Sequence, residues 1–227
     1  MKKLSLLVGG VVLSTVAMAQ KPAAADAPFS IEGQLGYNAA TFSFNAPSVR
    51  ARYFVADNIA VRLSLAINNY STSDIAYENP DFSGGTGTYE TKDNSWGLGL
   101  GAEYHFTGTD KLSPYVGLDI MFGGSKMTST GSDVDGANNY SAGDSYEVNT
   151  PSSMMGVNLL AGTDYYFAEN FYLGFELGWG FSSWTDKEGD FSFTSGGTTT
   201  SGKTNAEHKE GALTNNAISM FRLGWRF

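Results

Sequence analysis

The sequence predicts an all-β fold: eight antiparallel strands that close into an up-and-down transmembrane β-barrel. Three observations lead to this prediction. Apolar and polar residues alternate with period two along eight segments, as they do when a strand turns one face to an apolar environment. The connections alternate between tight turns and long polar stretches, which is typical of single-chain membrane barrels. The charged strand residues all fall on the polar faces, which line the lumen of a membrane barrel.

The first 19 residues have the features of a removable secretory signal peptide. A basic start at Lys2 and Lys3 precedes an apolar run, and the small residues 17–19 form a cleavage site before Gln20. An uncleaved membrane anchor is the alternative. It is disfavoured because the apolar run is short for a membrane span and two glycines interrupt it.

The rest of the chain is expected to form a short disordered linker over residues 20–28 and one outer-membrane barrel domain over residues 29–227. There is no cysteine, so no disulfide framework supports the domain. Cleavage would lower the formal net charge from −9 to −11, and this acidity argues against a nucleic-acid partner. After residue 19 no apolar run reaches the roughly 18 residues of a spanning helix.

The first three strands each carry apolar side chains at every second position. They are predicted at residues 29–37, 48–55 and 59–70. A tight turn at Asp57-Asn58 joins the second strand to the third. The segment 41–44 also alternates, but the sequence does not fix its register. The apolar faces are Phe29, Ile31, Gly33, Leu35 and Tyr37; Val49, Ala51, Tyr53 and Val55; and Ile59, Val61, Leu63, Leu65 and Ile67.

The remaining five strands follow the same rule, with a glycine-rich polar face that suits a narrow lumen. They are predicted at residues 95–106, 115–123, 155–167, 171–181 and 219–227. Three polar stretches between strands are predicted to be long, flexible surface loops, at residues 71–93, 124–153 and 182–214.

Aromatic residues mark the ends of the strands. Tyr53, Tyr104 and Tyr165 each begin a similar aromatic strand end, and the chain itself finishes on such an end. This repetition indicates one hairpin used four times. It also predicts two aromatic girdles. The girdle at the tight-turn end is Tyr53, Tyr104, Phe106, Tyr165, Phe167, Phe171, Trp225 and Phe227, and the other is Tyr37, Trp96, Phe122, Trp179 and Phe181.

The inward charges predict an ion network across the lower half of the lumen. All five arginines fall on polar strand faces, and arginine suits enclosed, bidentate pairing with carboxylates. Arg62 and Glu103 are the neighbours most directly expected to pair. A water-filled pore lined by charges is the alternative, although eight strands leave a bore only about wide enough for side chains. The predicted network comprises Glu32, Arg50, Arg52, Arg62, Glu103, His105, Asp119, Asp164, Glu176, Arg222 and Arg226.

These features resemble the small eight-stranded outer-membrane barrels of the OmpA-transmembrane and OmpX kind, and more closely the outer-membrane β-barrel proteins of Bacteroidetes-like bacteria. Phe221, Leu223, Trp225 and Phe227 are similar to the C-terminal signal that the barrel assembly machinery reads in such proteins. Because the chain ends at Phe227, we expect no peptidoglycan-binding domain after the barrel.

Catalysis and metal binding have weak support. The two histidines are His105 on the polar face of the fourth strand and His208 in the last loop, and neither sits in a pattern that supplies a nucleophile, a base and an orienting group. Asp133 and Asp135 offer hard oxygen ligands of the kind Ca²⁺ takes. They lack the full calcium-loop spacing, and Asp-Gly is ordinary turn chemistry. We expect a non-enzyme with no cofactor.

The sequence therefore predicts a structural, adhesive or partner-binding barrel with a plugged lumen. A passive channel for small solutes and a subunit of a larger envelope or secretion complex are the alternatives. The expected partners are outer-membrane lipid and lipopolysaccharide, the barrel assembly machinery during biogenesis, and a surface ligand that the sequence does not identify. The first two loops carry formal charges of −4 and −3, so divalent ions could bridge them to lipopolysaccharide phosphates.

Overall fold

The computed structural model of the protein describes residues 21–38, 41–43, 48–214 and 219–227. The predicted signal peptide, residues 1–19, lies outside the described residues. Within the described part of the chain, no helix is long and apolar enough to cross a membrane.

All regular secondary structure of the described residues is β-strand, joined by turns and short connections. The bounds of the strands are β1 (Phe29–Asn38), β2 (Thr41–Ser43), β3 (Ser48–Ala56), β4 (Ile59–Tyr77), β5 (Thr86–His105), β6 (Leu112–Val134), β7 (Tyr140–Tyr166), β8 (Phe171–Asp186), β9 (Asp190–Ser195), β10 (Thr198–Lys203), β11 (His208–Thr214) and β12 (Ser219–Arg226).

Eight of these strands pair in a closed ring. The order is β1-β3-β4-β5-β6-β7-β8-β12, and β12 pairs back onto β1 through the register that joins Ser30 to Arg226. Every pairing in the ring is antiparallel. The predicted eight-stranded antiparallel barrel is therefore confirmed.

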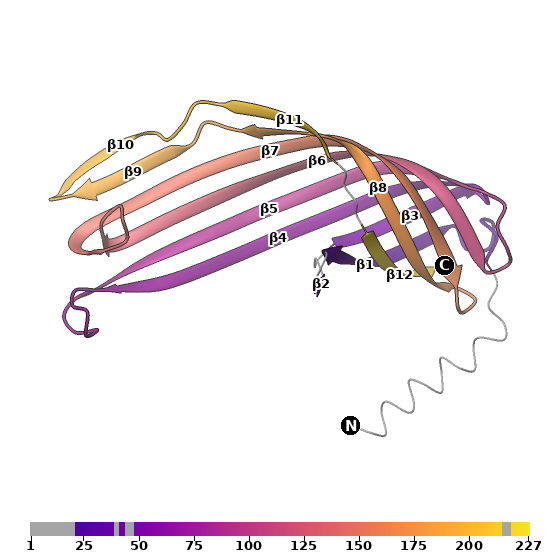
Figure 1. Ribbon diagram of the computed structural model, residues 1–227, viewed down its shortest axis with the longest axis horizontal. Helices are drawn as coiled ribbons and strands as arrows, with labels where there is room; N and C mark the ends of the chain where they lie inside the picture. Colours follow the sequence, from indigo (N-terminus) through magenta and orange to yellow (C-terminus); the bar gives the residue numbers. More distant parts are fainter. Residues whose placement is uncertain (1–20, 39–40, 44–47, 215–218) are drawn as a thin grey trace, which may run out of the picture.

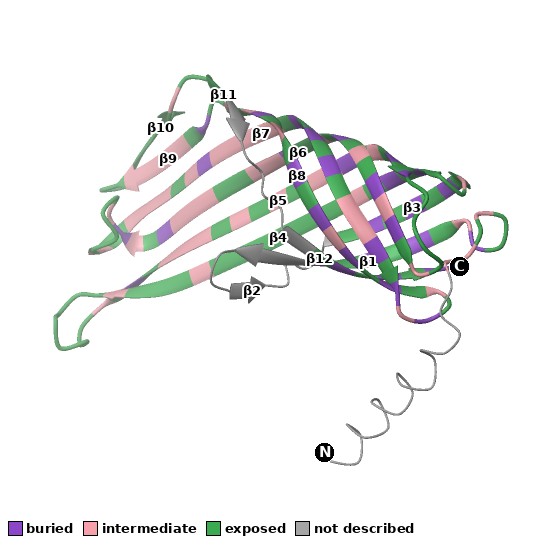
Figure 2. Ribbon diagram, turned by 45° about the vertical axis from the view of Figure 1, so that its right-hand side comes forward, coloured by how far each residue is buried: buried purple, intermediate pink, exposed green. Residues whose placement is uncertain are grey.

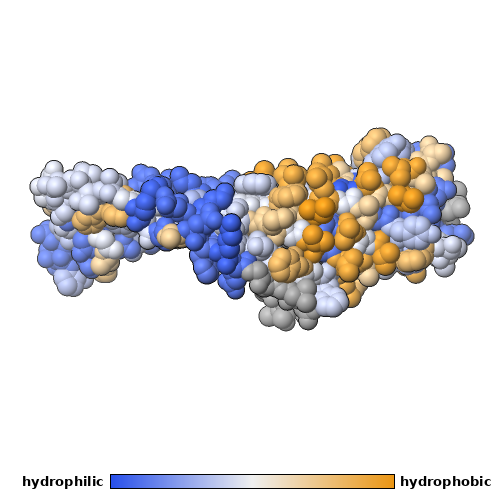
Figure 3. Space-filling view, turned by 90° about the horizontal axis from the view of Figure 1, so that it is seen from above, coloured by the Kyte–Doolittle hydropathy of each residue, from blue (hydrophilic) through white to orange (hydrophobic). Residues whose placement is uncertain are grey.

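The barrel is polar inside and apolar outside. Leu63 on β4 and Leu118 on β6 are each 46% exposed, whereas the neighbouring Arg62 is 3% exposed. Buried and exposed residues alternate along the barrel strands (Figure 2), and apolar side chains gather over this half of the molecule (Figure 3). A water-soluble barrel would have the opposite arrangement, so the outer face suits lipid.

Strands β4 to β7 continue far beyond the barrel, where the sequence predicts loops (Figure 1). The β4–β5 ladder runs on to the pair Tyr77–Thr86, and the β6–β7 ladder to Val134–Tyr140. The expectation of flexible loops over residues 71–93, 124–153 and 182–214 is therefore wrong for most of their length. Strands already aligned in the barrel can extend their ladder without a new loop-closure cost, and the threonines of these stretches favour strands.

We call this outer part the distal sheet. It comprises residues 68–77 of β4, 86–95 of β5, 124–134 of β6, 140–153 of β7 and 182–186 of β8, together with β9, β10 and β11. Strand β9 pairs with β7, β10 pairs with β9, and β11 pairs with β8. The opposite end of the barrel, with the tight turns, is the proximal end.

Residues 21–28 pack against the proximal turns, although the sequence predicts a disordered linker there. The Lys21 amide donates to the Asp110 carbonyl at 2.6 Å, and the Ala24 amide donates to Asp57 Oδ1 at 2.6 Å. Arg226 Nε donates to the Ala27 carbonyl at 2.7 Å. Composition does not show these partners, because each lies far away in the sequence.

At the proximal end, aromatic rings contact one another in an unbroken series from Phe167 to Tyr53. Ring centroids lie 4.6 Å apart for Trp225 and Phe227, 6.3 Å for Phe171 and Trp225, and 5.0 Å for Phe29 and Tyr53. Phe29, which the sequence does not assign to the girdle, links Tyr53 to Phe227. The second girdle contains the exposed rings of Trp96, Phe122, Trp179 and Phe181; the side chain of Tyr37 lies outside the described residues.

Candidate functional site: the lumen ion network

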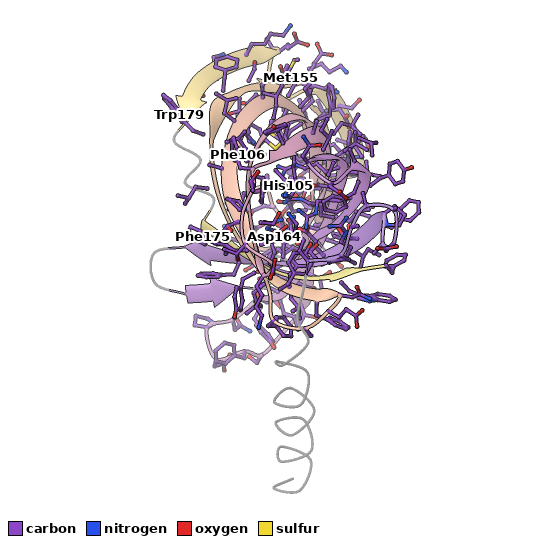
Figure 4. The ribbon with its side chains drawn as sticks, turned by 90° about the vertical axis from the view of Figure 1, so that its right-hand side faces the viewer. His105, Phe106, Met155, Asp164, Phe175 and Trp179 are labelled. Atoms are coloured by element: carbon purple, nitrogen blue, oxygen red, sulfur yellow. The ribbon has the colours of Figure 1, made fainter. Side chains whose placement is uncertain are left out.

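All eleven residues predicted to form the lumen network point into the barrel. Each is 6% exposed or less, because alternation on every barrel strand turns these positions away from the apolar surface. Figure 4 looks along the long axis of the molecule, with the side chains of His105 and Asp164 inside the ring of strands and Trp179 outside it.

Arg52 lies at the centre of the network. Its guanidinium is 2.7 Å from Glu32, 2.9 Å from Glu103 and 2.8 Å from Asp164. Arg222 pairs with two of the same carboxylates, at 3.0 Å from Glu32 and 2.9 Å from Asp164. Two arginines and two carboxylates therefore form a closed cycle in which every side chain is fully buried.

Arg62 joins a second group of carboxylates. Its Nη1 is 2.8 Å from Glu103 and 2.8 Å from Glu176, and its other nitrogens donate to both oxygens of Asp119. Arg50 pairs with Glu176 at 3.0 Å. The Arg62–Glu103 pair that the sequence predicts is thus formed, as one contact in a larger network.

Glycines make room for these charged side chains. Gly101 on β5 lies between Arg62 on β4 and Asp119 on β6 in the strand register, and a Cβ at Gly101 would collide with the Asp119 carboxylate. A Cβ at Gly174 would crowd the Arg222 guanidinium in the same way. The glycine-rich polar faces therefore give long side chains space to cross the lumen.

Three buried tyrosines complete the network, and the sequence analysis missed their role. The Tyr115 hydroxyl donates to Glu176 at 2.6 Å and accepts from Arg222 at 2.5 Å. The Tyr172 hydroxyl donates to Glu32 at 2.7 Å. Tyr166 packs against Tyr172, with ring centroids 5.2 Å apart. The available signal was spacing: each tyrosine lies an even number of residues from an inward carboxylate of its own strand, Asp119, Asp164 or Glu176.

Arg226 closes the proximal end in a different way. Its guanidinium lies 3.6 Å from the centroid of the Phe54 ring, and it is bonded to the Ala27 carbonyl. Among the described residues it has no carboxylate within salt-bridge distance. The structure therefore places Arg226 below the ion pairs, as part of an aromatic floor.

His105 connects the network to Ser113. Its Nδ1 lies 2.9 Å from the Ser113 hydroxyl, and its Nε2 lies 3.1 Å from Glu103. Serine, histidine and glutamate in a row resemble a catalytic triad in composition. However, Ser113 is only 2% exposed, and Glu103 is already held by two arginines. This geometry serves hydrogen bonding better than nucleophilic attack.

The C-terminal residues that resemble an assembly signal lie on the lipid-facing side of β12 and just after it. Phe221, Leu223, Trp225 and Phe227 are 42%, 51%, 44% and 45% exposed. Alternation separates them from Arg222 and Arg226, which point inward from the same strand.

Asp133 and Asp135, the weak candidates for a metal site, are used in turns of the distal sheet. Asp133 accepts from the Gly143 amide at 2.8 Å, and Asp135 accepts from the amides of Ala137 and Asn139 at 2.9 Å each. These backbone donors hold the pKa of the Asp135 carboxyl below its ordinary value. The described residues contain no cluster of three or more acidic or histidine side chains that could hold a metal.

A cavity of about 240 Å³ lies on the distal side of the network. Arg50, Asp119 and Glu176 contribute charged groups to its lining, and Met121, Met154 and Leu160 contribute apolar ones. The upper lumen therefore contains unfilled space, whereas the level of Arg52 and Arg222 is occupied by buried side chains.

The chain resembles one known protein family over more than half of its length. Residues 43–182 match the family described as "Putative OmpA-OmpF-like porin family". No curated protein matches the sequence.

Three solved structures resemble it weakly. Acinetobacter baumannii CarO2 has a TM-score of 0.34 and 10% identity, with 88% of this chain and 99% of that chain covered. Acinetobacter baumannii CarO has a TM-score of 0.33 and 12% identity, with 88% and 95% covered. The KdgM porin in complex with disordered oligogalacturonate has a TM-score of 0.18 and 12% identity, with 87% and 98% covered.

Proposed function

The chain belongs to the OmpA-OmpF-like porin family, and from this premise we propose that it is a closed outer-membrane barrel that acts through its distal sheet rather than through its lumen. Its proximal end faces the periplasm and its distal sheet faces the outside, in keeping with the short inner turns and long outer connections of such barrels. The distal sheet is then the part of the protein that meets partners or surfaces.

The main support for a lumen closed to ions is that ion pairs join strands on opposite sides of the ring. Arg52 on β3 lies 2.8 Å from Asp164 on β7, and Arg62 on β4 lies 2.8 Å from Glu176 on β8. Each pair has three strands between its members on either side. Side chains from opposite walls therefore meet in the middle of the bore, and a hydrated ion has no room to pass.

The proximal floor supports the same proposal. Phe54 and Tyr166 are 3% and 1% exposed, and Arg226 ties this floor to the segment 21–28 through the Ala27 carbonyl. An ion that passed the charged network would still meet this second layer.

Conductance of the refolded full chain in planar lipid bilayers tests the proposal. We expect a silent barrel. The sixfold variant Arg52→Ser, Asp164→Ser, Arg62→Ser, Glu176→Ser, Phe54→Ser, Tyr166→Ser removes both opposite pairs at unchanged net charge and opens the proximal floor, and we expect it to show channel openings. The matched control Glu90→Ser, Lys92→Ser removes an exposed pair in the distal sheet and should remain silent. Steady conductance by the unaltered protein would sink the proposal.

A passive channel for small solutes is the second candidate. The cavity of about 240 Å³ in the upper lumen favours it, since that cavity already occupies part of a path across the barrel. The same bilayer experiment separates the two candidates. Crosslinking followed by pull-down would reveal whether the barrel is instead one subunit of a larger envelope complex.

We also propose export through a cleaved signal peptide and assembly through the C-terminal strand. The features of residues 1–19 support cleavage before Gln20, which the intact mass of the protein purified from outer membranes would test. The outward-facing Phe227 supports recognition by the assembly machinery, and the variant Phe227→Ser should then reach the outer membrane in smaller amounts.

A further inference from the structure

The two faces of the distal sheet differ sharply in charge. Strand register assigns each paired residue to a face: Tyr70, Asp93 and Met127 lie in one row across β4, β5 and β6. This row continues the lumen side of the barrel strands, because it is an even number of residues from Gly97 on β5 and Gly123 on β6, which line the lumen. We call this side the inner face.

All the lysines at paired positions of the distal sheet lie on the outer face. They are Lys92, Lys126, Lys203 and Lys209, and three acids, Glu90, Glu147 and Asp190, share that face with them. The inner face carries the acids Asp74, Asp93, Asp186 and Glu210, with no lysine or arginine at its paired positions. The inner face is therefore acidic, whereas the outer face is close to neutral.

The inner face also carries exposed aromatic and thioether side chains. Tyr70 is 60% exposed, Trp184 49% and Met127 43%. Tyr89, Tyr146, Phe191 and Phe193 lie on the same face and are half-buried. Rings beside carboxylates attract cations by two routes, through the ring face and through direct ion pairing.

Asp93 has a buried carboxylate oxygen, Oδ1, that lacks a hydrogen-bond donor among the described residues. Asp93 lies between Tyr70 and Met127 in the register. Buried carboxylate oxygens are normally paired, so a donor brought by a ligand would complete this site.

We propose that the inner face of the distal sheet binds a basic polypeptide segment, rich in arginine or lysine. The inference rests on the proposed function, in which the distal sheet is the working surface. Asp74 on β4 and Asp186 on β8 stand four strand positions apart, or about 19 Å at the usual strand spacing of about 4.8 Å. Their rows meet β7 at Tyr146 and Ser152, which adds a separation of about 20 Å along the strands. A small cation cannot contact both, whereas an extended chain of roughly nine residues can. Anionic lipid or nucleic acid would be repelled by this face.

The test uses the refolded full chain in detergent and a fluorescent peptide of alternating arginine and glycine. We expect binding, measured by fluorescence anisotropy, that weakens as NaCl is raised. A peptide of the same length with glutamate in place of arginine should not bind.

Two triple variants with the same change in net charge localise the binding. Asp74→Asn, Asp93→Asn, Asp186→Asn alters the inner face, and Glu90→Gln, Glu147→Gln, Asp190→Asn alters the outer face. We expect the first to weaken binding roughly tenfold or more and the second to leave it within about twofold. The double variant Tyr70→Ser, Trp184→Ser should weaken it as well, at unchanged net charge. Heat-modifiable mobility on SDS gels verifies that each variant is folded.

Two results would overturn the inference: no binding of the arginine peptide, or equal weakening by both triple variants, which would mean attraction to bulk charge only. Either result leaves the proposed function standing if the barrel is silent in bilayers. A conducting barrel would remove the proposed function without changing the peptide result, so the two failures are distinguishable.

Discussion

The barrel and the distal sheet share strands β4 to β8, yet these strands use their two faces in opposite ways in the two regions. On β4, the outward side chains Leu63 and Leu65 in the barrel give way to Asn69, Ser71 and Ser73 in the distal sheet. The barrel turns its apolar face to lipid and its charges inward, while the distal sheet exposes aromatic rings on its inner face. Side chains alternate between the two faces along the whole of each strand. The chemical character of each face changes where the strand leaves the barrel.

Ion pairs differ between the two regions in the same way. Lys92 and Glu90 lie 2.8 Å apart in the distal sheet, with 52% and 33% of their side chains exposed. Arg52 and Asp164 are also 2.8 Å apart but fully buried. Exposed pairs contribute little to stability, whereas breaking a buried pair strands a charge. Distance alone therefore says little about the energy of these contacts.

The largest expected effect comes from breaking the buried network. Arg52→Met leaves three carboxylates without their shared partner, and we expect the free energy of unfolding to fall by about 3–5 kcal/mol. Urea unfolding in lipid vesicles, followed by tryptophan fluorescence, measures it. The control Lys92→Met removes an exposed pair and should cost less than about 1 kcal/mol. Equal effects would contradict the contrast between the two regions.

The next effect locates the boundary between the regions on one strand. Leu63 and Ile75 both point outward from β4 and are 46% and 53% exposed in the protein alone. Leu63→Arg should destabilise the protein by about 2–4 kcal/mol in vesicles, because it places a charge near the middle of the bilayer. Ile75→Arg should change stability by less than about 0.5 kcal/mol. A large effect at Ile75 would mean that the distal sheet also contacts lipid.

A smaller effect tests the crowding of the lumen. A Cβ at Gly224 would overlap the Tyr172 ring, whereas a Cβ at Gly33 would have no atom within 4 Å. We expect Gly224→Ala to reduce the free energy of unfolding by about 1–3 kcal/mol and Gly33→Ala to change it by less than about 0.5 kcal/mol. The same urea titration compares the two variants. An unchanged free energy of unfolding in Gly224→Ala would show that the lumen has unfilled space beside Tyr172.

The smallest effect is local to the distal sheet. The amides of Ala137 and Asn139 lower the pKa of Asp135, so the ionised carboxylate stabilises this turn. That contribution is full above the ordinary aspartate pKa and is lost as pH falls through the lowered one. The protection factors of these two amides against hydrogen exchange, taken relative to the unprotected rate at each pH, should therefore be high at neutral pH and fall in acid. In Asp135→Ala these protection factors should be low at every pH, and equal protection in the variant and the unaltered protein would exclude the turn-capping role.

Much of the barrel is readable in the sequence because alternation is a local property. The faces of β8 and β12, the inward arginines, and the family resemblance to small outer-membrane barrels all follow from period-two patterns, and the family match confirms the resemblance. The sequence also indicates that Arg62 and Glu103 are neighbours, since their strands adjoin through one long hairpin.

Only the tertiary structure decided which charges meet across the bore. Arg52 and Asp164 are separated by about half of the chain and come together because the ring closes between β12 and β1. The same holds for the segment 21–28, whose partners Asp57 and Asp110 belong to distant turns. The length of β4 to β7 also escaped prediction, since polar residues on both faces resemble a loop until neighbouring strands supply the hydrogen bonds. The alternation of side chains can be read from the sequence alone. Contacts across a closed barrel depend on the strand register, which is fixed only when the strands pair.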